Sequence, residues 1–162
     1  MKSASHPTAL RVQQMLATTG LPGKVVEFEQ PTRTSAEAAA AIGCAVAEIA
    51  KSVVFRGASS GRAIVVVASG DNRVSEEKVA KSVGEQPVRA DAAFVRETTG
   101  YVIGGVCPAG LAGTVSLLLD EDLRRFERLW AAAGTPFSVF PLTPEELQRL
   151  TGAPWCNIRV EQ

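Results

Sequence analysis

Residues 104–110, GGVCPAG, place three glycines, a cysteine and a proline between two apolar runs. A turn needs only one or two residues of this kind. Because Gly104 and Gly105 carry no side chain, a ligand could contact their backbone N–H and C=O groups, with Pro108 stiffening the wall. The alternative is a wide turn with flexible glycines and no ligand. The segment lacks the GxxxxGK[ST] and GxGxxG patterns of phosphate-binding loops.

Cys107 is the residue of this loop that could act as a nucleophile. A thiol needs a neighbouring base to form the reactive thiolate. The only histidine, His6, lies near the N-terminus ahead of a proline, where we expect it to be solvated. A Cys–His or Ser–His pair is therefore not expected, and Cys107 is more simply interpreted as a residue that lines a pocket.

Lys51 begins a second segment of interest, directly before Ser52 and an apolar run. A lysine at this place can simply end a buried strand and face water. Alternatively, its ammonium group reaches into a cleft, where it can hold a phosphate as a point charge. The residues alone leave both interpretations open.

Composition restricts the class of protein. The chain has 162 residues, 46% of them hydrophobic, and its 17 basic and 17 acidic residues balance, as is typical of one soluble globular domain. Zero formal charge argues against coating DNA or RNA by bulk electrostatics, whereas a small basic pocket for one nucleic-acid end is compatible with it. The apolar run AIVVVA is far too short to span a bilayer. We expect no DNA partner and no membrane segment.

The thiols and the start of the chain point to a reducing compartment. The first residues, MKSASHPTAL, lack the apolar stretch of a signal peptide, and the three cysteines are scattered without CxxC spacing. Neither a disulfide framework nor a zinc site fits this pattern. We therefore expect a cytoplasmic protein with reduced cysteines, no metal and no cofactor.

The elements that must position these residues show no regular strand–helix–strand repeat. Helical patterns cover residues 8–20, 34–43, 75–84, 91–100, 120–134 and 143–152, with a further turn at 46–50. Strand patterns cover residues 24–29, 51–57, 62–70, 101–105, 113–120 and 136–141, and GASSG joins the second and third of these as a hairpin. We predict a single α+β domain over residues 1–162 with a mixed sheet.

Four segments together resemble the YbaK/EbsC family, whose members are free-standing relatives of the editing (insertion) domain of bacterial prolyl-tRNA synthetase. They are IAKSVVFRG, AIVVVASGDNRVSEEKVAK, TGYVIGGVCPAG and LDEDLRRFERLWAAAG. The resemblance extends from the first helix to the last. Its most specific parts are the lysine at the strand start and the later G-G-V-x-P-x-G loop, and it is their order that makes them specific.

The resemblance implies a mixed, curved sheet with flanking helices and hydrolysis of mischarged aminoacyl-tRNA, of which mischarged tRNA-Pro or the ester of a related small amino acid is the expected form. In the family the lysine helps hold the 3′-terminal adenosine, and the glycine-rich loop holds the ester against its backbone. The partners it implies are the 3′ acceptor end of aminoacyl-tRNA and a synthetase such as prolyl-tRNA synthetase. The candidate residues are Lys51, Gly104 and Gly105 for catalysis and Phe28, Thr34, Ser52, Val106, Cys107 and Pro108 for substrate binding.

This reaction matches the unusual composition of the loop. An aminoacyl ester is already activated, so hydrolysis needs an oriented water, a stabilised oxyanion and exclusion of the wrong side chain. Backbone dipoles can supply these without a histidine, and a rigid pocket can act as the second sieve that a synthetase lacks. Two departures concern the amino acid: cysteinyl-specific members tend to have serine in place of Cys107 and polar groups in place of WAAAG.

Two other functions remain open. The chain could be a non-catalytic module that docks on a synthetase or binds a nucleotide-like ligand, or a thiol-dependent hydrolase that uses Cys107. An idle module has no need of both Lys51 and the Gly-Gly segment, and a thiol hydrolase lacks a base. The residues favour a trans-editing deacylase.

Overall fold

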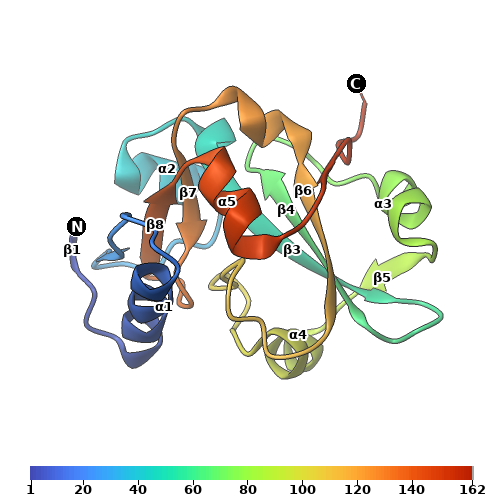
Figure 1. The fold of residues 1–162 in the computed structure, drawn as a ribbon, viewed down its shortest axis with the longest axis horizontal. Coiled ribbons are helices and arrows are strands. Elements are labelled where there is room, and N and C mark those ends of the chain that lie inside the picture. The colour runs from blue at the N-terminus through green and yellow to red at the C-terminus, as the bar shows by residue number, and fades with distance from the viewer. Residues whose placement is uncertain (162) are drawn as a thin grey trace.

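A computed structural model describes residues 1–161 and shows one mixed sheet flanked by helices, the predicted α+β fold (Figure 1). The nine strands of these residues follow the order β1-β2-β8-β7-β3-β4-β6-β9, and β5 pairs with β3. Their bounds are β1 Lys2–Ser3, β2 Val26–Glu27, β3 Ile49–Gly57, β4 Ala63–Ser69, β5 Pro87–Arg89, β6 Val115–Asp120, β7 Leu129–Ala132, β8 Ser138–Leu142 and β9 Trp155–Cys156. Gln162, included in the predicted domain, lies outside the described residues.

Helices cover both faces of the sheet. They are α1 Pro7–Thr18, α2 Ser35–Ile42, α3 Glu76–Val83, α4 Ala92–Thr99 and α5 Pro144–Thr151, with the 3-10 helices η1 Val46–Glu48 and η2 Glu121–Arg125. α1, α4 and α5 pack in one core with Ala50 and Val67. On the opposite face, α3 packs with Ile64 and Val66 and α2 with Ile49. Because successive strand residues alternate between faces, Lys51 shares the α2 and α3 face and Ser52 shares the other.

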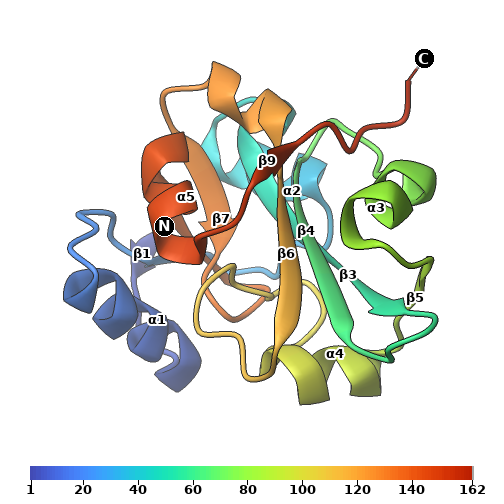
Figure 2. The same ribbon diagram turned by 45° about the vertical axis from the view of Figure 1, so that its right-hand side comes forward.

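The predicted hairpin of β3 and β4 is the centre of the sheet. All seven residues of β4 are buried, because helices pack on both of its faces while antiparallel β3 and parallel β6 pair with its two edges (Figure 2). A continuous β-branched run is the pattern expected of a strand covered on both faces. The hairpin therefore forms a rigid base that fixes the position of Lys51 and Ser52.

The predicted helix ends are confirmed where side chains cap them. Thr34 accepts a hydrogen bond from the Glu37 backbone N–H at 3.1 Å, and Thr143 and Glu146 form a complete capping box. The solvated His6 has a structural use that the sequence did not indicate, because its Nδ1 accepts from the Thr8 N–H at 3.1 Å and caps α1.

The predicted helix over residues 120–134 is wrong. Asp120 accepts from the Asp122 N–H at 2.9 Å and begins η2, after which the chain extends into β7. In β7 the buried Leu129 and Ala131 alternate with half-buried neighbours. Parallel pairing with β3 and antiparallel pairing with β8 thus outweigh the helical spacing of the apolar residues.

The predicted strand over residues 101–105 is also wrong. The Gly105 N–H donates to the Val102 carbonyl at 2.9 Å and closes a turn, and Gly104 has a φ of +86°. Ile103 is 59% exposed and does not pack in a sheet. The segment is a loop because glycine permits a left-handed backbone that a strand does not adopt.

Candidate functional site

An interruption in the sheet creates the candidate site. On one edge, β3 pairs with β7 through Ile49 and Ala50 and with β5 through Phe55 to Gly57. Between these contacts, residues 51–54 have no strand partner on this edge within residues 1–161. A gap therefore opens between β5 and β7 along the middle of β3.

The backbone of β3 faces this gap at every second residue. The Gly57 N–H donates to Arg62 at 2.8 Å, and the Gly70 N–H donates to Ile49 at 2.7 Å. In an antiparallel pair the directions of the backbone groups alternate, so odd-numbered residues of β3 bond β4. The N–H and C=O groups of Ser52 and Val54 consequently point to the open edge.

A cavity of about 660 Å³ lies at this gap. Pockets of roughly 300–1,000 Å³ hold a single small molecule. Both faces of β3 contribute, because Lys51 and Val53 belong to one face and Ser52 and Val54 to the other. The remaining walls come from the segment before α2, the start of α2, β7, the loop after α4 and the turn before β8; residues of these walls include Arg33, Thr34, Ala38, Ile103, Gly104, Val106, Trp130, Ala131, Ala132, Thr135 and Ser138.

The charges that line the cavity are all positive. Lys51 and Arg33 are its charged residues within the described chain, and no carboxylate lines it. Neither cation forms an ion pair with another described residue. Burial lowers the pKa of the half-buried Lys51 ammonium, and the nearby Asp120 and Asp71 oppose this shift. The cavity is therefore suited to an anionic group in a chain with no net charge.

Ser52, a residue of the cavity lining, carries an unpaired hydroxyl. Its Oγ is buried and has no hydrogen-bond partner in residues 1–161. Buried polar atoms are normally paired, so this hydroxyl is an exception among the described residues. Two further hydroxyls of the lining, from Thr135 and Ser138, are buried and bond each other at 2.6 Å.

The two loop glycines have different roles in the structure. Gly104 lines the cavity, and a Cβ placed on it would lie 3.8 Å from Pro136, an ordinary contact. Gly105 is buried outside the lining, and a Cβ there would lie 2.7 Å from the Thr135 Cα and 2.9 Å from the Gly134 carbonyl carbon. Gly105 is thus required for close approach of two backbones, whereas Gly104 presents its own backbone to the cavity.

The structure brings five of the nine predicted residues to the cavity: Lys51, Thr34, Ser52, Gly104 and Val106. The Thr34 hydroxyl is already engaged as the cap of α2. Phe28, Gly105, Cys107 and Pro108 are buried and do not line the cavity. The backbone N–H of Phe28 instead donates to Phe137 at 2.7 Å, behind the turn that forms one wall.

The prediction that Cys107 lines the pocket requires correction. Its side chain is fully buried among the residues of the α1, α4 and α5 core. Burial raises the pKa of its thiol to about 12, although the Ala109 backbone and the Tyr101 hydroxyl partly oppose the shift. A neutral thiol without access to the cavity has neither the ionisation nor the position of a nucleophile.

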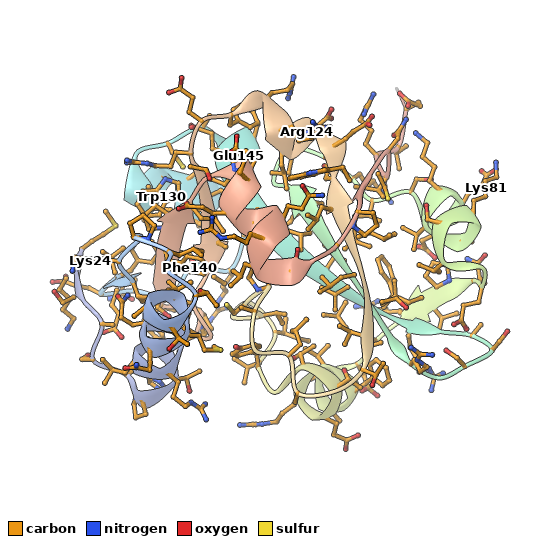
Figure 3. The ribbon with its side chains drawn as sticks, in the orientation of Figure 1. Lys24, Lys81, Arg124, Trp130, Phe140 and Glu145 are labelled. Carbon is orange, nitrogen blue, oxygen red and sulfur yellow. The ribbon has the colours of Figure 1, made fainter. Side chains whose placement is uncertain are left out.

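Several cavity residues were missed by sequence reasoning. Trp130 lies on β7 (Figure 3), in a segment predicted as helix, so its pairing with Ile49 of β3 and its place in the cavity could not be foreseen. Thr135 belongs to the turn that follows and Ser138 begins β8; the strand predicted over residues 136–141 gave no sign that either residue faces a cavity. Arg33 precedes a helix cap and showed no distinguishing pattern.

Residues 1–161 contain no group of three or more histidine, cysteine, aspartate or glutamate side chains placed to hold a metal ion. The same residues contain no helix long and apolar enough to cross a membrane.

The fold and the site define a small α+β protein with a cationic cavity walled in part by free backbone. Residues 29–150 match the family model of the aminoacyl-tRNA editing domain, and the chain belongs to this family. This finding confirms the resemblance predicted from the sequence.

Relatives span nearly the same length. The chain is 39% identical over 127 residues to the uncharacterized protein YwhH of Bacillus subtilis strain 168, covering 78% of this chain and 80% of YwhH. It is 27% identical over 145 residues to EbsC of Enterococcus faecalis, a candidate Cys-tRNA(Pro)/Cys-tRNA(Cys) deacylase, covering 88% of each. A crystal structure of a candidate trans-editing enzyme for prolyl-tRNA synthetase matches with a TM-score of 0.90 and 43% identity, covering 98% of this chain and 100% of that one.

Proposed function

We propose that the protein is a trans-editing enzyme that hydrolyses the ester of mischarged aminoacyl-tRNA. The observation that carries this proposal is the cavity itself, in which two unpaired cations and the free backbone of β3 and Gly104 meet in a chain of the editing family. Its substrate is made and used in the cytoplasm, where we infer that the protein works.

Lys51 is the residue that we propose to hold the 3′-terminal nucleotide. Its ammonium group is half-buried, lines the cavity and has no carboxylate partner within hydrogen-bonding distance in the described residues. A partly desolvated cation interacts more strongly with a phosphate than an exposed one. Arg33 at the same cavity adds a second cation for the negatively charged backbone of the tRNA end.

We propose that backbone groups orient the ester. The N–H groups of Ser52 and Val54 point to the gap, and Gly104 presents its backbone from the loop after α4. Donors fixed by a buried hairpin can stabilise the oxyanion that forms when water adds to the ester carbonyl, without reorganisation during the reaction. The ester C–O bond then breaks, and the free amino acid and the tRNA hydroxyl leave.

The walls of the cavity leave room for the aminoacyl nucleoside at the end of a charged tRNA. Ala50, Ala131, Ala132, Gly104 and Ser52 contribute little side-chain volume to the cavity, so space remains for an aminoacyl nucleoside. The unpaired Ser52 hydroxyl favours an amino acid that offers a hydrogen-bonding group. Similarity to the candidate trans-editing enzyme for prolyl-tRNA synthetase supports mischarged tRNA-Pro, or the ester of a related small amino acid, as the proposed substrate and prolyl-tRNA synthetase as the proposed partner.

The test is deacylation of a panel of mischarged tRNAs by the wild-type protein and by Lys51→Ala. We expect loss of at least tenfold in kcat/KM for the variant with an unchanged melting temperature, because a half-buried lysine without a partner contributes little to stability. Lys81→Ala is the matched control, since Lys81 lies on α3 at the opposite side of the molecule from Trp130 (Figure 3). Wild-type binding without hydrolysis of any member of the panel would contradict the proposal and favour a non-catalytic module.

A further inference from the structure

Three exposed apolar side chains gather on two loops of the molecule. Val102, Ile103 and Phe137 are 36%, 59% and 41% exposed, and together they make up half of the six large apolar residues exposed in residues 1–161. We refer to these three residues as the apolar rim. Exposed apolar groups that gather at one place mark a binding surface more often than scattered ones do.

The two loops of the apolar rim are in contact. A Cβ placed on Gly104 would lie 3.8 Å from the Pro136 side chain, and Gly105 packs against the Thr135 backbone. Ile103 and Phe137 are the next residues outward on the two segments. Ile103 and Gly104 from one loop, and Thr135 from the other with Ser138 at the start of β8, line the cavity. The apolar rim therefore borders the cavity.

Phe137 is presented by a fixed turn. Its carbonyl accepts from the Phe28 N–H at 2.7 Å, and its own N–H donates to the Thr135 hydroxyl at 3.1 Å. The preceding carbonyl, of Pro136, accepts from the Thr32 N–H at 2.9 Å. Three hydrogen bonds thus hold the backbone while the ring remains exposed, so little entropy is lost when a ligand covers it.

The size and charge of the cavity identify what covers the apolar rim. A volume of about 660 Å³ suits one aminoacyl nucleoside, so the rest of a single-stranded tRNA end must lie outside it. The chain leaving the cavity carries phosphates, for which Lys51 and Arg33 are the available cations. Unstacked bases of single-stranded RNA bind preferentially to exposed aromatic side chains.

We propose that the apolar rim binds the unpaired nucleotides that precede the terminal adenosine of the substrate tRNA, with a base stacked on Phe137 and the adjacent chain against Ile103. This inference rests on the proposed function and extends it from the ester to the macromolecular part of the substrate. The rim adds affinity for tRNA without contacting the amino acid, so one site can accept the same tRNA end with different esters.

The experiment compares two substrates that share the reacting ester, an aminoacyl-tRNA and the corresponding aminoacyl-adenosine. For Phe137→Ala we expect the ratio of kcat/KM for the tRNA to kcat/KM for the adenosine to fall roughly 5- to 150-fold, the equivalent of about 1–3 kcal/mol for one stacked base. Phe137→Trp should keep the wild-type ratio. Leu10→Ala is the matched control, because Leu10 is an exposed apolar residue on α1, which contributes no residue to the cavity lining.

An unchanged ratio in Phe137→Ala would overturn the inference. If the ratio is unchanged because both substrates lose activity equally, Phe137 acts in the folding or chemistry of the cavity. A second measurement is independent of catalysis: binding of an uncharged RNA stem ending in CCA, followed by fluorescence anisotropy. Weaker binding by Phe137→Ala than by Leu10→Ala supports the inference, and equal binding overturns it. If the wild-type protein binds the stem but hydrolyses no ester, the proposed function fails while the inference about the rim stands.

Discussion

At the scale of single residues, Lys51 combines a partly buried position with a positive charge. Burial favours the neutral amine and lowers the pKa, while Asp120 and Asp71 favour the charged form. The working form in our proposal is the cation, which is present at low pH and lost as pH rises through the lowered pKa. Deacylation should therefore fall on the alkaline side below the ordinary lysine pKa.

The pH dependence of kcat/KM tests this role of Lys51. Asp71→Asn removes one charge that supports the cation, so its alkaline limb should move to lower pH. Lys51→Arg should move the limb to higher pH or abolish it, because the guanidinium stays protonated. The same limb in the wild-type protein and in Lys51→Arg would show that another group titrates.

The Ser52 hydroxyl should lower the stability of the protein and increase its selectivity among amino acids. Its Oγ is buried without a partner in residues 1–161, and an unsatisfied buried hydroxyl costs roughly 1–3 kcal/mol. Ser52→Ala should therefore leave the melting temperature unchanged or raise it by a few degrees. The variant should also discriminate less between amino acids that can and cannot form a hydrogen bond, as measured by kcat/KM over the panel. A large drop in melting temperature would mean that the hydroxyl has a structural partner.

The Cys107→Ala variant tests whether the thiol takes part in catalysis. Because the side chain is fully buried away from the cavity, the variant should lose roughly 1–2 kcal/mol of unfolding free energy. It should keep its deacylation rate and its preference among amino acids, measured at a temperature at which the variant is fully folded. Loss of turnover on every substrate in a folded variant would restore the thiol as a catalyst.

At the scale of elements, the site depends on two backbones that approach closely. Gly105 packs on Gly134 and Thr135 at distances that a Cβ does not tolerate. Gly105→Ala should force the loop and the turn apart, with a loss of roughly 1–3 kcal/mol in unfolding free energy and reduced activity, since both segments line the cavity. The melting temperature and the deacylation rate should fall together. Gly61→Ala is the control: its Cβ would meet no atom within 4 Å, but φ is +72°, so the substitution should lower stability alone.

The elements that could be predicted from the sequence are those with local signals. Capping side chains such as Thr34 and Thr143 and the β-branched hairpin determine their structure within a few residues. The segment at 120–134 lacked such a signal, because its apolar spacing fits a helix while its structure depends on partners in β3 and β8.

The residues of the candidate site, like the elements, could be predicted only where a local motif marks them. Lys51, Ser52 and Gly104 lie in segments whose motifs mark them, and the resemblance supplied their proposed roles. Cys107 was misplaced because the sequence does not show which side of the loop faces the core. The gap between β5 and β7 was invisible, since it arises from strands far apart in the chain that pair with different parts of β3.

At the scale of the whole molecule, the balance of charge separates this protein from those that coat nucleic acids. The formal net charge is zero, with 17 basic and 17 acidic residues, yet the cavity is lined by two cations and no carboxylate in residues 1–161. Attraction to tRNA should therefore be local, confined to the phosphates that Lys51 and Arg33 reach.

The salt dependence of binding measures how many phosphates are reached. Each phosphate contact on a single strand contributes a slope of about −0.7 to the plot of log affinity against log salt, so two contacts predict a slope of about −1.4. Lys51→Ala and Arg33→Ala should each make the slope shallower by about 0.7, whereas Lys81→Ala on the far side should leave it unchanged. Anisotropy titrations of a CCA-ended RNA stem over a range of potassium chloride concentrations provide the measurement. A slope several times steeper, unaffected by both substitutions, would mean that the tRNA contacts a large basic surface outside the cavity.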